Sequence, residues 1–321
     1  MNKRIKKILT YAKSPDGWFV LLAYLGLFKK MEDKKYLKKM YLGRMGYSIN
    51  LESPKKFNEK LQWLKLYDRK PEYTTMVDKY AVKKYVADII GEQYIIPTLG
   101  VWDRFEDIDF DKLPNQFVLK CTHDSGGLVI CRDKSKFDFK SARKKINKCL
   151  KRNYYYIGRE QPYKNVVPRI IAEQYMEDTQ NTDLRDYKFF CFNGEPVYCQ
   201  VISERTSNET IDFFDMEWNH QEFTGLALPN EPFSSSPIPI PIPTQFDEMK
   251  KVAKILAKES AFLRVDFYEV KGNLYFGELT FYPASGFGVF SPDKYNLIIG
   301  KMLKLPVKSD KKFAHNTQIA G

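Results

Sequence analysis

Two short segments near the end of the chain predict a β-hairpin with a carboxylate on each strand. Residues 263–267 read Leu-Arg-Val-Asp-Phe, residues 275–280 read Tyr-Phe-Gly-Glu-Leu-Thr, and Lys-Gly-Asn at 271–273 is typical of a turn. Counting back from a three-residue turn places Asp266 opposite Glu278. Facing carboxylates repel each other across a ladder, so this register makes physical sense if a hard cation such as Mg²⁺ lies between them. The hairpin therefore predicts a metal site and points to phosphate chemistry.

The same register fixes the other residues of the hairpin. Val270 faces Leu274 at the turn, and Asn273 adopts the left-handed conformation that the last turn position needs. Arg264 lies opposite Thr280, so both side chains join the carboxylates on one face, while the alternate positions of the first strand face the core. The competing interpretation is that this polar face is only the wet surface of an exposed sheet.

The composition is that of a globular protein with an anionic partner. The 321 residues are 43% hydrophobic, and 52 Lys and Arg against 40 Asp and Glu give a net charge of +12. This charge suits a membrane surface, a nucleic acid or an acidic polymer without selecting one. The five cysteines are odd in number and contain no Cys-x-x-Cys pair, which predicts reduced, mostly buried thiols in a cytoplasmic protein. Three widely separated histidines argue against a zinc site.

The first 48 residues combine basic and apolar stretches. Basic residues within 3–7 precede an apolar run from Trp18 to Phe28, and Lys29 and Lys30 follow it. The run is shorter than the roughly 20 residues that a spanning helix needs, and no signal-peptide cleavage site follows it. The segment predicts either a helix in the interface of an anionic membrane or a helix docked on the protein's own core. We accordingly predict a cytoplasmic protein, peripheral to the inner face of the plasma membrane in the first case.

Apolar spacing divides the rest of the chain into helical and strand-rich parts. Helices are predicted at 58–66, 75–90, 141–152 and 246–260, with Gly91 as the C-terminal stop of the second. Strands are predicted at 117–120, 128–131, 170–176, 187–192 and 196–202, the last two joined by an Asn193-Gly194 turn. Alternating prolines predict an extended connection at 234–244. The polar end from residue 307 predicts disorder.

A glycine loop follows the first of these strands. Lys120 ends the strand, and the loop from Cys121 contains Ser125, Gly126 and Gly127. Paired glycines can bring backbone N–H groups against phosphate oxygens, and a lysine at the strand end adds a positive charge. The loop fits neither the P-loop pattern nor the dinucleotide-binding pattern. A plain glycine hairpin turn is the alternative interpretation.

In their order along the chain, these features resemble the ATP-grasp superfamily over roughly residues 78–292. The closer likeness is to the teichuronopeptide-biosynthesis-like (TupA-like) ATP-grasp family of bacterial polysaccharide biosynthesis. The motifs that carry it are Pro-Lys-Lys-Phe-Asn-Glu-Lys-Leu-Gln-Trp at 54–63, Asp-Lys-Tyr at 78–80 and Gly-Glu-Leu-Thr-Phe-Tyr-Pro at 277–283. The resemblance implies an α+β fold in which two subdomains with antiparallel sheets clamp ATP.

The resemblance also implies a division of the chain. A basic helical region would occupy residues 1–75, the ATP-grasp core 76–306 and a polar tail 307–321. Within the core, a lid subdomain would cover about 115–190 and a metal-binding subdomain about 191–306.

The ATP site is assigned by the resemblance residue by residue. Lys120 and Lys188 would hold the phosphates, and the loop residues Ser125, Gly126 and Gly127 would cover them. Asp186 is the candidate partner of the ribose. Adenine would bind along the strand that ends in Glu173, Gln174, Tyr175 and Met176.

The reacting centre is assigned in the same way. Asp266 and Glu278 match the metal ligands, and Arg264 matches the arginine that steadies the phosphorylated intermediate. Thr280 replaces the superfamily's Asn; its hydroxyl is a ligand type that Mg²⁺ accepts. His123 is a candidate general base for the amine, with a purely structural loop histidine as the alternative.

The reaction implied is that of a carboxylate–amine ligase using ATP and Mg²⁺. A substrate carboxylate takes the γ-phosphoryl group, and an amine then displaces phosphate to form an amide. The family context implies a uronic acid of a surface polysaccharide or its precursor, carried on a lipid or a nucleotide, and an amino acid or small amine. The basic surface suits an anionic saccharide.

Three rival functions remain. A nucleotide-sugar glycosyltransferase would use Asp107-Ile-Asp109 as its metal motif, although an acid-x-acid match is expected by chance in a chain with 40 acidic residues. An ATP-grasp kinase would stop at phosphoryl transfer to a hydroxyl. A nucleic-acid-binding module would need basic and aromatic residues interleaved on one face, and only residues 151–156 offer such a cluster. We therefore expect no nucleic-acid partner.

Overall fold

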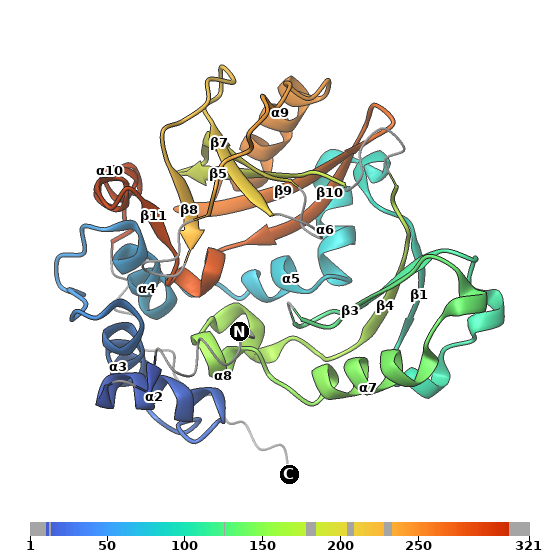
Figure 1. Cartoon of the computed structure of the whole chain (residues 1–321), viewed down its shortest axis with the longest axis horizontal. Coiled ribbons are helices and arrows are strands. Elements are labelled where there is room, and N and C mark those ends of the chain that lie inside the picture. The colour runs from blue at the N-terminus through green and yellow to red at the C-terminus, as the bar shows by residue number, and fades with distance from the viewer. Residues whose placement is uncertain are drawn as a thin grey trace, which may run out of the picture.

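Two main β-sheets, a two-stranded sheet and surrounding helices make up the described structure (Figure 1). The computed structural model describes residues 11–12, 14–124, 126–177, 184–203, 209–227 and 233–307. The large sheet has the strand order β10-β9-β5-β6-β7, the small sheet has the order β1-β4-β2-β3, and β11 pairs with β8. All paired neighbours are antiparallel. The α+β architecture with antiparallel sheets is confirmed.

The strands of the small sheet are β1 (Thr98–Trp102), β2 (Phe117–Cys121), β3 (Leu128–Cys131) and β4 (Ile170–Gln174). Those of the large sheet are β5 (Asp186–Phe192), β6 (Glu195–Ser203), β7 (Thr210–Phe214), β9 (Phe262–Val270) and β10 (Asn273–Thr280). The short pair consists of β8 (Thr224–Ala227) and β11 (Val289–Ser291). The helices are α2 (Pro15–Tyr24), α3 (Asp33–Met45), α4 (Phe57–Tyr67), α5 (Tyr73–Val77), α6 (Ala81–Ile90), α7 (Phe139–Leu150), α8 (Tyr155–Gly158), α9 (Phe246–Ala257) and α10 (Lys294–Met302).

The large sheet buries one face under α9. The apolar side of this helix, which includes Phe246 and Met249, packs on β5 and β9, and the rings of Phe246 and Phe189 lie 5.8 Å apart. Because side chains alternate along a strand, Leu263, Val265 and Phe267 are buried on this face as predicted. The residues between them on β9 consequently face the small sheet, which sets the position of the functional groups.

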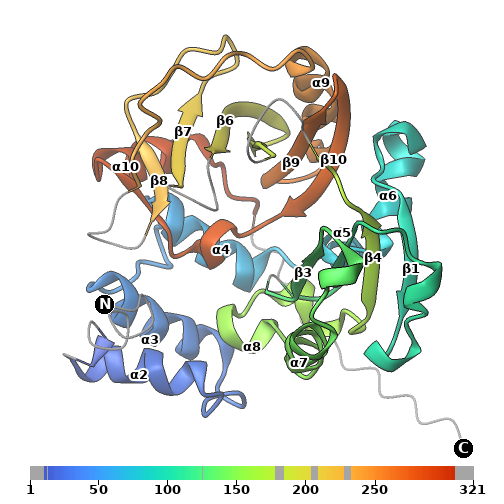
Figure 2. The same ribbon diagram turned by 45° about the vertical axis from the view of Figure 1, so that its right-hand side comes forward.

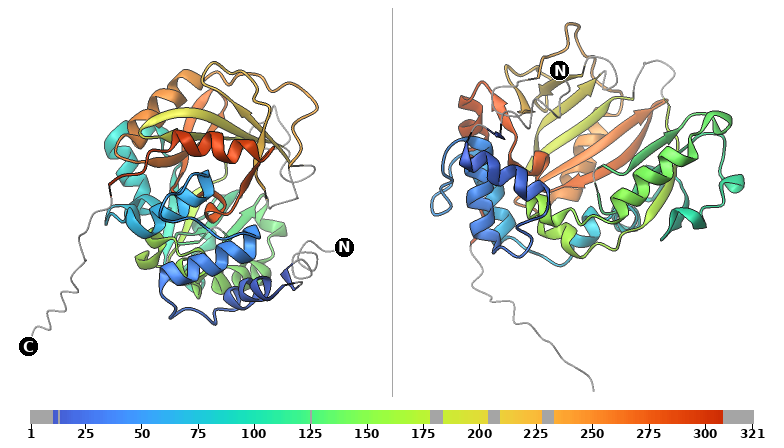
Figure 3. Two further views of the ribbon diagram at one scale, coloured as in Figure 1. Left: turned by 90° about the vertical axis from the view of Figure 1, so that its left-hand side faces the viewer. Right: turned by 60° about the horizontal axis from the view of Figure 1, so that its bottom comes forward.

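The small sheet has a separate apolar core under α7. Phe117, Leu119 and Cys121 of β2 pack there against Ile146 and Cys149 of the helix, which lies along the outside of the sheet (Figure 3). The sheet runs from residue 98 to 174, and β5 at 186–192 already belongs to the large sheet. The predicted lid range of about 115–190 therefore omits β1 and ends inside β5.

The β9–β10 hairpin has the predicted pairing of its carboxylates but a different turn. Its turn has two residues, Lys271 (φ 51°) and Gly272 (φ 75°), and Val270 pairs with Asn273. The predicted pairing of Val270 with Leu274 and the predicted left-handed Asn273 are therefore wrong. Positive φ at both turn residues is the type I′ geometry, whose twist matches that of the strands.

A β-bulge at Gly277 then restores the pairing. The register shifts by one residue between Phe276 and Glu278, so Asp266 lies opposite Glu278 as predicted, and Arg264 opposite Thr280. A Cβ atom at position 277 would lie 3.0 Å from the carbonyl oxygen of Asp266, which explains the glycine. The turn is one residue shorter than predicted and the bulge adds one residue, so the register beyond the bulge is the predicted one.

Replacing Lys271 with Asn should stabilise the protein. Lys271 holds a left-handed conformation that Asn adopts more readily, and Asn-Gly is the preferred type I′ pair, so we expect the free energy of unfolding to rise by about 1 kcal/mol. Urea unfolding measures this change. Lys271→Gln is the matched control, because it removes the charge without the backbone preference. Equal stability of the two variants would contradict the turn assignment.

Most of the predicted elements are present with small shifts at their ends. The exception is the helix predicted at 75–90, which is divided into α5 and α6. Asp78 accepts hydrogen bonds from the backbone N–H groups of Tyr80 (2.9 Å) and Ala81 (3.2 Å), and so begins α6 after a break. Gly91 ends α6 with φ 109°, as predicted. The break places Lys79 where it reaches the space between the sheets.

The N-terminal helices α2 and α3 lie at the edge of the molecule, away from both sheets (Figure 2). Val20 and Ala23 of α2 are buried, which is the predicted docking of this segment on the protein itself, while Trp18 and Leu25 are exposed. None of the described helices is long and apolar enough to cross a membrane. The basic residues at 3–7 and the predicted disordered tail from 308 lie outside the described residues.

The cysteines and the proline-rich connection have the states that the sequence predicts. All five cysteines are free and buried. The described part of the proline-rich segment, residues 234–244, contains neither a helix nor a strand.

Candidate active site

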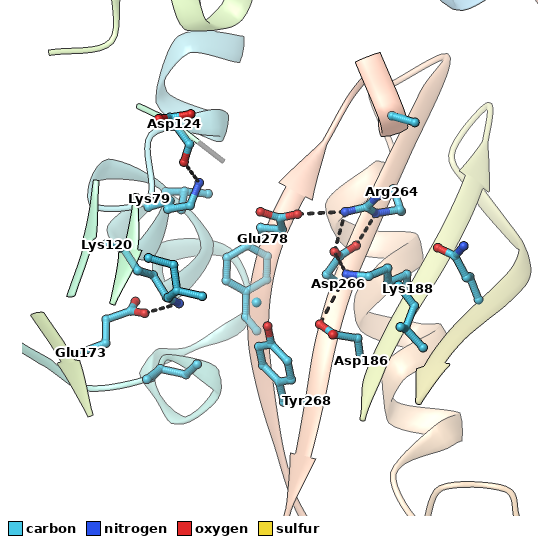
Figure 4. A pocket seen from close by; sticks show the side chains of 18 of the residues that line it. Lys79, Lys120, Asp124, Glu173, Asp186, Lys188, Arg264, Asp266, Tyr268 and Glu278 are labelled. Carbon is cyan, nitrogen blue, oxygen red and sulfur yellow. Dashed lines mark hydrogen bonds and ion pairs between the residues drawn. The ribbon is translucent and has the colours of Figure 1, made fainter. Parts of the chain in front are cut away.

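A cavity of about 390 Å³ lies between the two sheets. One wall comes from the large sheet and carries Asp186, Lys188, Arg264, Asp266 and Glu278, and the other comes from the small sheet and α6 (Figure 4). The second wall contributes Lys79, Lys83, Lys120, Asp124, Gly127 and Glu173. Residues far apart in the sequence thus form one strongly charged site.

Arg264 bridges the two facing carboxylates. Its Nε and Nη2 atoms donate to the two oxygens of Asp266 at 2.6 and 2.7 Å, and Nη2 also donates to Oε1 of Glu278 at 2.8 Å. Nη2 further donates to Oγ1 of Thr280 at 3.1 Å. The predicted repulsion between Asp266 and Glu278 is therefore offset by a guanidinium, whose planar fork suits paired carboxylates.

Lys188 adds a second cation to this cluster. Its Nζ lies 2.5 Å from Oδ2 of Asp266 and 3.4 Å from Oδ1 of Asp186. Lys188, Asp186 and Asp266 are all at most 6% exposed. Because β5 lies directly beside β9, with Lys188 paired to Asp266, the sheet register itself creates this contact.

Glu278 remains accessible to the cavity. The side chain of Glu278 is 40% exposed, whereas that of Asp266 is 1% exposed. Burial opposes ionisation, but the positive charges of Lys79, Arg264 and Lys188 outweigh it and hold the pKa of Glu278 at about 2. Glu278 therefore stays a carboxylate at any physiological pH and points toward the wall that carries Lys79 (Figure 4).

Glu173 organises the lysines of the opposite wall. Its oxygens lie 2.6 Å from Nζ of Lys83 and 2.5 Å from Nζ of Lys120. Burial works against the charged form, but these two lysines hold the pKa of Glu173 at about 2. The carboxylate thus fixes two cations that face the cavity.

The stability of the protein should depend on Glu173 below pH 5. Its folded pKa lies below the ordinary value of 4.5, so its contribution is present above that value and is lost as the pH falls toward 2, by about 3 kcal/mol in all. We expect Glu173→Gln to reduce stability at pH 7 and to flatten this part of the pH profile. Urea unfolding from pH 3 to 7 tests this, with Glu106→Gln at an exposed ion pair as control. Parallel profiles for wild type and Glu173→Gln would refute it.

Lys79 and Lys83 are cavity residues that the sequence did not reveal as functional. Nζ of Lys79 donates to the backbone oxygen of Asp124 at 3.0 Å, and the backbone N–H of Lys79 donates to the oxygen of Thr122. Lys83 of α6 pairs with Glu173 of β4, so the two lysines link α6 and the residues just before it to the small sheet. The available signal was the Asp-Lys-Tyr motif at 78–80, which carries the family resemblance but no evident chemistry.

A strained turn beside the cavity is held by α4, which includes residues 57–63 of the motif at 54–63. Ala284 and Ser285 have φ values of 50° and 54°, and Ala284 lines the cavity. Nζ of Lys65 donates to the oxygen of Ser285 at 2.8 Å, and Nε2 of Gln62 donates to that of Gly286 at 2.7 Å. Since both donors come from α4, this helix fixes the backbone at the edge of the site.

His123 is buried and lies outside the cavity. The side chain is 2% exposed, and its Nε2 lies 3.0 Å from the oxygen of Arg152 and 3.2 Å from that of Cys149. It does not line the cavity, so we withdraw the role of general base for it. Its contacts at the end of α7 agree with the alternative interpretation of a structural loop histidine.

The other predicted residues are distributed unevenly. Lys120, Gly127, Glu173 and Asp186 line the cavity, but Gly126, Gln174, Tyr175 and Met176 do not. Ser125 lies outside the described residues. Thr280 contacts Arg264 and lies 3.2 Å from Oε1 of Glu278. The binding roles of these residues stay predictions.

The rival metal motif lies outside this cavity. The side chain of Asp107 pairs with Arg104, and that of Asp109 pairs with Lys112 at 3.1 Å. Both carboxylates are about half exposed. They flank a short connection on the small-sheet side and do not face Asp266.

The oxygen ligands in the cavity fit a magnesium ion that is bound together with substrate phosphates. Within the described ranges, no three His, Cys, Asp or Glu side chains gather to hold a metal. Asp266 and Glu278 are two hard carboxylates on one face, and Mg²⁺ is usually bound by one or two carboxylates together with substrate phosphates. The residues therefore suit a metal that arrives with a nucleotide.

Comparison with known proteins gives one family and several solved structures. A model of the family described as TupA-like ATPgrasp matches residues 59–304. Similar structures include the D-alanine–D-alanine ligase from Bacillus anthracis complexed with ATP, at 18% identity and a TM-score of 0.36, covering 64% of this chain and 53% of that one. The L-amino acid ligase from Bacillus licheniformis shows 12% identity and a TM-score of 0.44, covering 78% and 56%. The chain thus spans just over half the length of these two proteins. No curated protein matches it.

Proposed function

The chain belongs to the TupA-like ATP-grasp family, and we propose that it is an ATP-dependent ligase that joins a carboxylate to an amine. The observation that carries the proposal is the cavity between the sheets, where Arg264 and Lys188 surround Asp266 and Glu278. Lysines of the small sheet face them across the cavity. Phosphoryl transfer needs this kind of inventory, because charge spreads over the phosphate oxygens while the protein supplies fixed cations.

In the proposed reaction, an oxygen of the acid attacks the γ-phosphorus of ATP, and ADP leaves. The amine nitrogen then attacks the acyl carbon, phosphate departs with the bonding electrons, and the amine loses a proton to solvent. Lys120 and Lys188 bind phosphate oxygens, and Arg264 orients the acyl phosphate. The two walls enclose the reacting groups and limit hydrolysis by water.

Asp266 and Glu278 are the residues that would hold Mg²⁺, with Thr280 as a third candidate. The metal supplies neutralisation of the phosphate charge when it is bound. Glu278 is ionised and partly exposed and so is available to it. Arg264 donates two bonds to Asp266 that do not depend on Glu278, so Glu278 would be free to hold the metal.

We propose that the acid is a uronic acid of a bacterial surface polysaccharide, such as a capsule or O-antigen, or of its precursor. The amine would be an amino acid or a small amine. The net charge of +12 supports an anionic saccharide. A saccharide carried on a membrane lipid would place the enzyme in the cytoplasm at the inner face of the plasma membrane.

Lys120→Ala should raise the KM for ATP about tenfold or more. The substitution removes a cation from the cavity, while Glu173 keeps its ion pair with Lys83 and the fold is retained. Steady-state ADP release at varied ATP measures the effect. Lys144→Ala, on the outer side of α7, is the matched control. An unchanged KM in Lys120→Ala would contradict the phosphate role.

Product analysis tests the proposed function. Purified protein with Mg-ATP, a panel of uronic acids and hydroxylamine should release ADP and form a hydroxamate, since hydroxylamine traps an acyl phosphate. A stable phosphorylated sugar without hydroxamate would indicate a kinase. Thermal stabilisation by UDP-sugars and not by Mg-ATP would indicate a glycosyltransferase, because a ligand at about 100 times its Kd stabilises the native state by roughly 2.7 kcal/mol.

A further inference from the structure

The outer face of α2 carries an apolar stripe whose two ends are exposed in the described structure. Trp18, Leu21, Leu22 and Leu25 follow the i, i+3, i+4, i+7 spacing of one helix face. Trp18 is 52% exposed and Leu25 is 75% exposed, and the two leucines between them are half-buried. Leu27, just beyond the helix, is 61% exposed. Surface helices normally expose polar residues on this side, so the stripe calls for a partner.

Close backbone contact fixes the direction in which the stripe points. A Cβ atom at Gly43 of α3 would lie 2.3 Å from the oxygen of Asp16 and 2.6 Å from Cγ2 of Val20, so α2 sits directly on the backbone of α3. Val20 and Ala23 are buried on that side. The stripe therefore cannot be turned inward without losing this packing.

The segment that contains α2 and α3 carries a net positive charge on exposed side chains. Residues 14–45 contain seven Lys and Arg against three Asp and Glu, a net charge of +4. Lys29, Lys30, Lys35, Lys38 and Lys39 are all exposed. Nζ of Lys39 lies 5.7 Å from the ring of Phe19, which borders the stripe. Of the three acids, Asp33 is already bound to Arg69 at 2.8 Å.

We propose that α2 docks on the surface of an anionic lipid bilayer, with Trp18, Leu21, Leu22 and Leu25 inserted at the interface and the neighbouring lysines on the headgroups. A short helix with Trp and Leu on one side and lysines beside it has the composition of an interfacial anchor. Lysines near an anionic bilayer also add attraction that salt screens. This surface goes beyond the proposed ligase function and does not depend on it.

A second copy of the chain fits the same stripe poorly. Pairing two stripes would bring the lysines of both copies together, and lysine is depleted in protein–protein interfaces. One ten-residue helix also offers little of the roughly 1,000 Å² that a stable interface buries. The charge pattern therefore favours the bilayer.

Vesicle binding tests the proposal with the full-length protein and without substrate, so its outcome is separate from that of the ligase assay. We expect sedimentation with vesicles of phosphatidylcholine and phosphatidylglycerol, weaker binding at high salt, and little binding to phosphatidylcholine alone. Trp18→Ser with Leu25→Ser should lower the partition coefficient tenfold or more. Lys35→Gln, Lys38→Gln and Lys39→Gln together should lower it for anionic vesicles.

The matched control removes exposed apolar side chains elsewhere. Ile238 and Ile242 are 63% and 54% exposed in the proline-rich connection, and replacing both with Ser should leave vesicle binding unchanged. The proposal is overturned if the wild type does not bind, or if the stripe variant binds as well as the wild type. It is also overturned if the stripe variant converts a dimer to a monomer in light scattering, which would assign the surface to a second copy.

Discussion

Glu278→Ala should reduce turnover by about a thousandfold or more while the protein stays folded, as expected for the loss of one fixed group that stabilises the transition state. The side chain of Glu278 is partly exposed, and its lowered pKa keeps it ionised at neutral pH. Its negative charge is therefore available to a metal that binds with the phosphates. Its removal leaves Arg264 with both bonds to Asp266. The ion-pair cluster behind the site therefore survives the substitution.

Single-turnover ADP release and urea unfolding separate the two parts of this expectation. Glu195→Ala is the control, since Glu195 lies on the same sheet in an exposed ion pair with Lys254. It should change neither quantity. A Glu278→Ala protein that is unfolded would show the residue to be structural, and one that keeps full activity would remove it from the site.

The two facing carboxylates were predicted correctly because a turn one residue shorter than expected and a bulge of one residue cancel each other. A side-chain period of two fixes which residues share a face, and the strands were long enough to define it. The turn itself was predicted one residue too long. The bulge at Gly277 compensated for that error, and the sequence held no sign of it beyond a glycine inside a strand.

The opposite wall of the site could not be predicted in the same way. The family resemblance assigned Lys120 and Glu173 to the site, but Lys79 and Lys83 join them only because α6 and the residues before it contact the small sheet. Such contacts depend on how the sheets are placed, and local patterns contain no information on that. His123 shows the converse error, because a histidine in a glycine loop looks reactive until its burial is known.

In the described structure, the cation between the two carboxylates is a side chain, Arg264. Repulsion across the ladder correctly indicated that a positive charge was needed, but it did not distinguish a metal from a side chain. Arg264 was already in the segment, two residues before Asp266, and its length allows it to reach Glu278 across the ladder. The metal, if the proposed function holds, joins a cluster that the protein has already neutralised in part.

Arg264→Ala should lower the free energy of unfolding by about 3 kcal/mol, because it leaves a buried carboxylate without its main partner. Asp266 loses two charge-assisted hydrogen bonds and keeps Lys188, while Glu278 loses its guanidinium partner. Arg264→Lys should recover part of the stability, since it restores a charge but lacks the planar fork. Arg143→Ala is the control at the surface ion pair with Glu106 and should cost little.

The pH dependence gives this prediction its sharpest test. In the wild type, burial raises the pKa of Asp266 although Arg264 and Lys188 oppose this shift, while the burial of Glu278 is outweighed by Lys79, Arg264 and Lys188, which lower its pKa. Without Arg264, the pKa of Asp266 should rise further, so that this carboxyl binds a proton more readily in the folded state than in the unfolded state. The stability of Arg264→Ala should therefore rise more steeply than that of the wild type as the pH falls from 7 to 5. Urea unfolding across this range measures both slopes, and adding Asp266→Asn to the variant should remove the difference. Parallel profiles for the wild type and Arg264→Ala would show that the guanidinium does not stabilise the ionised form of Asp266.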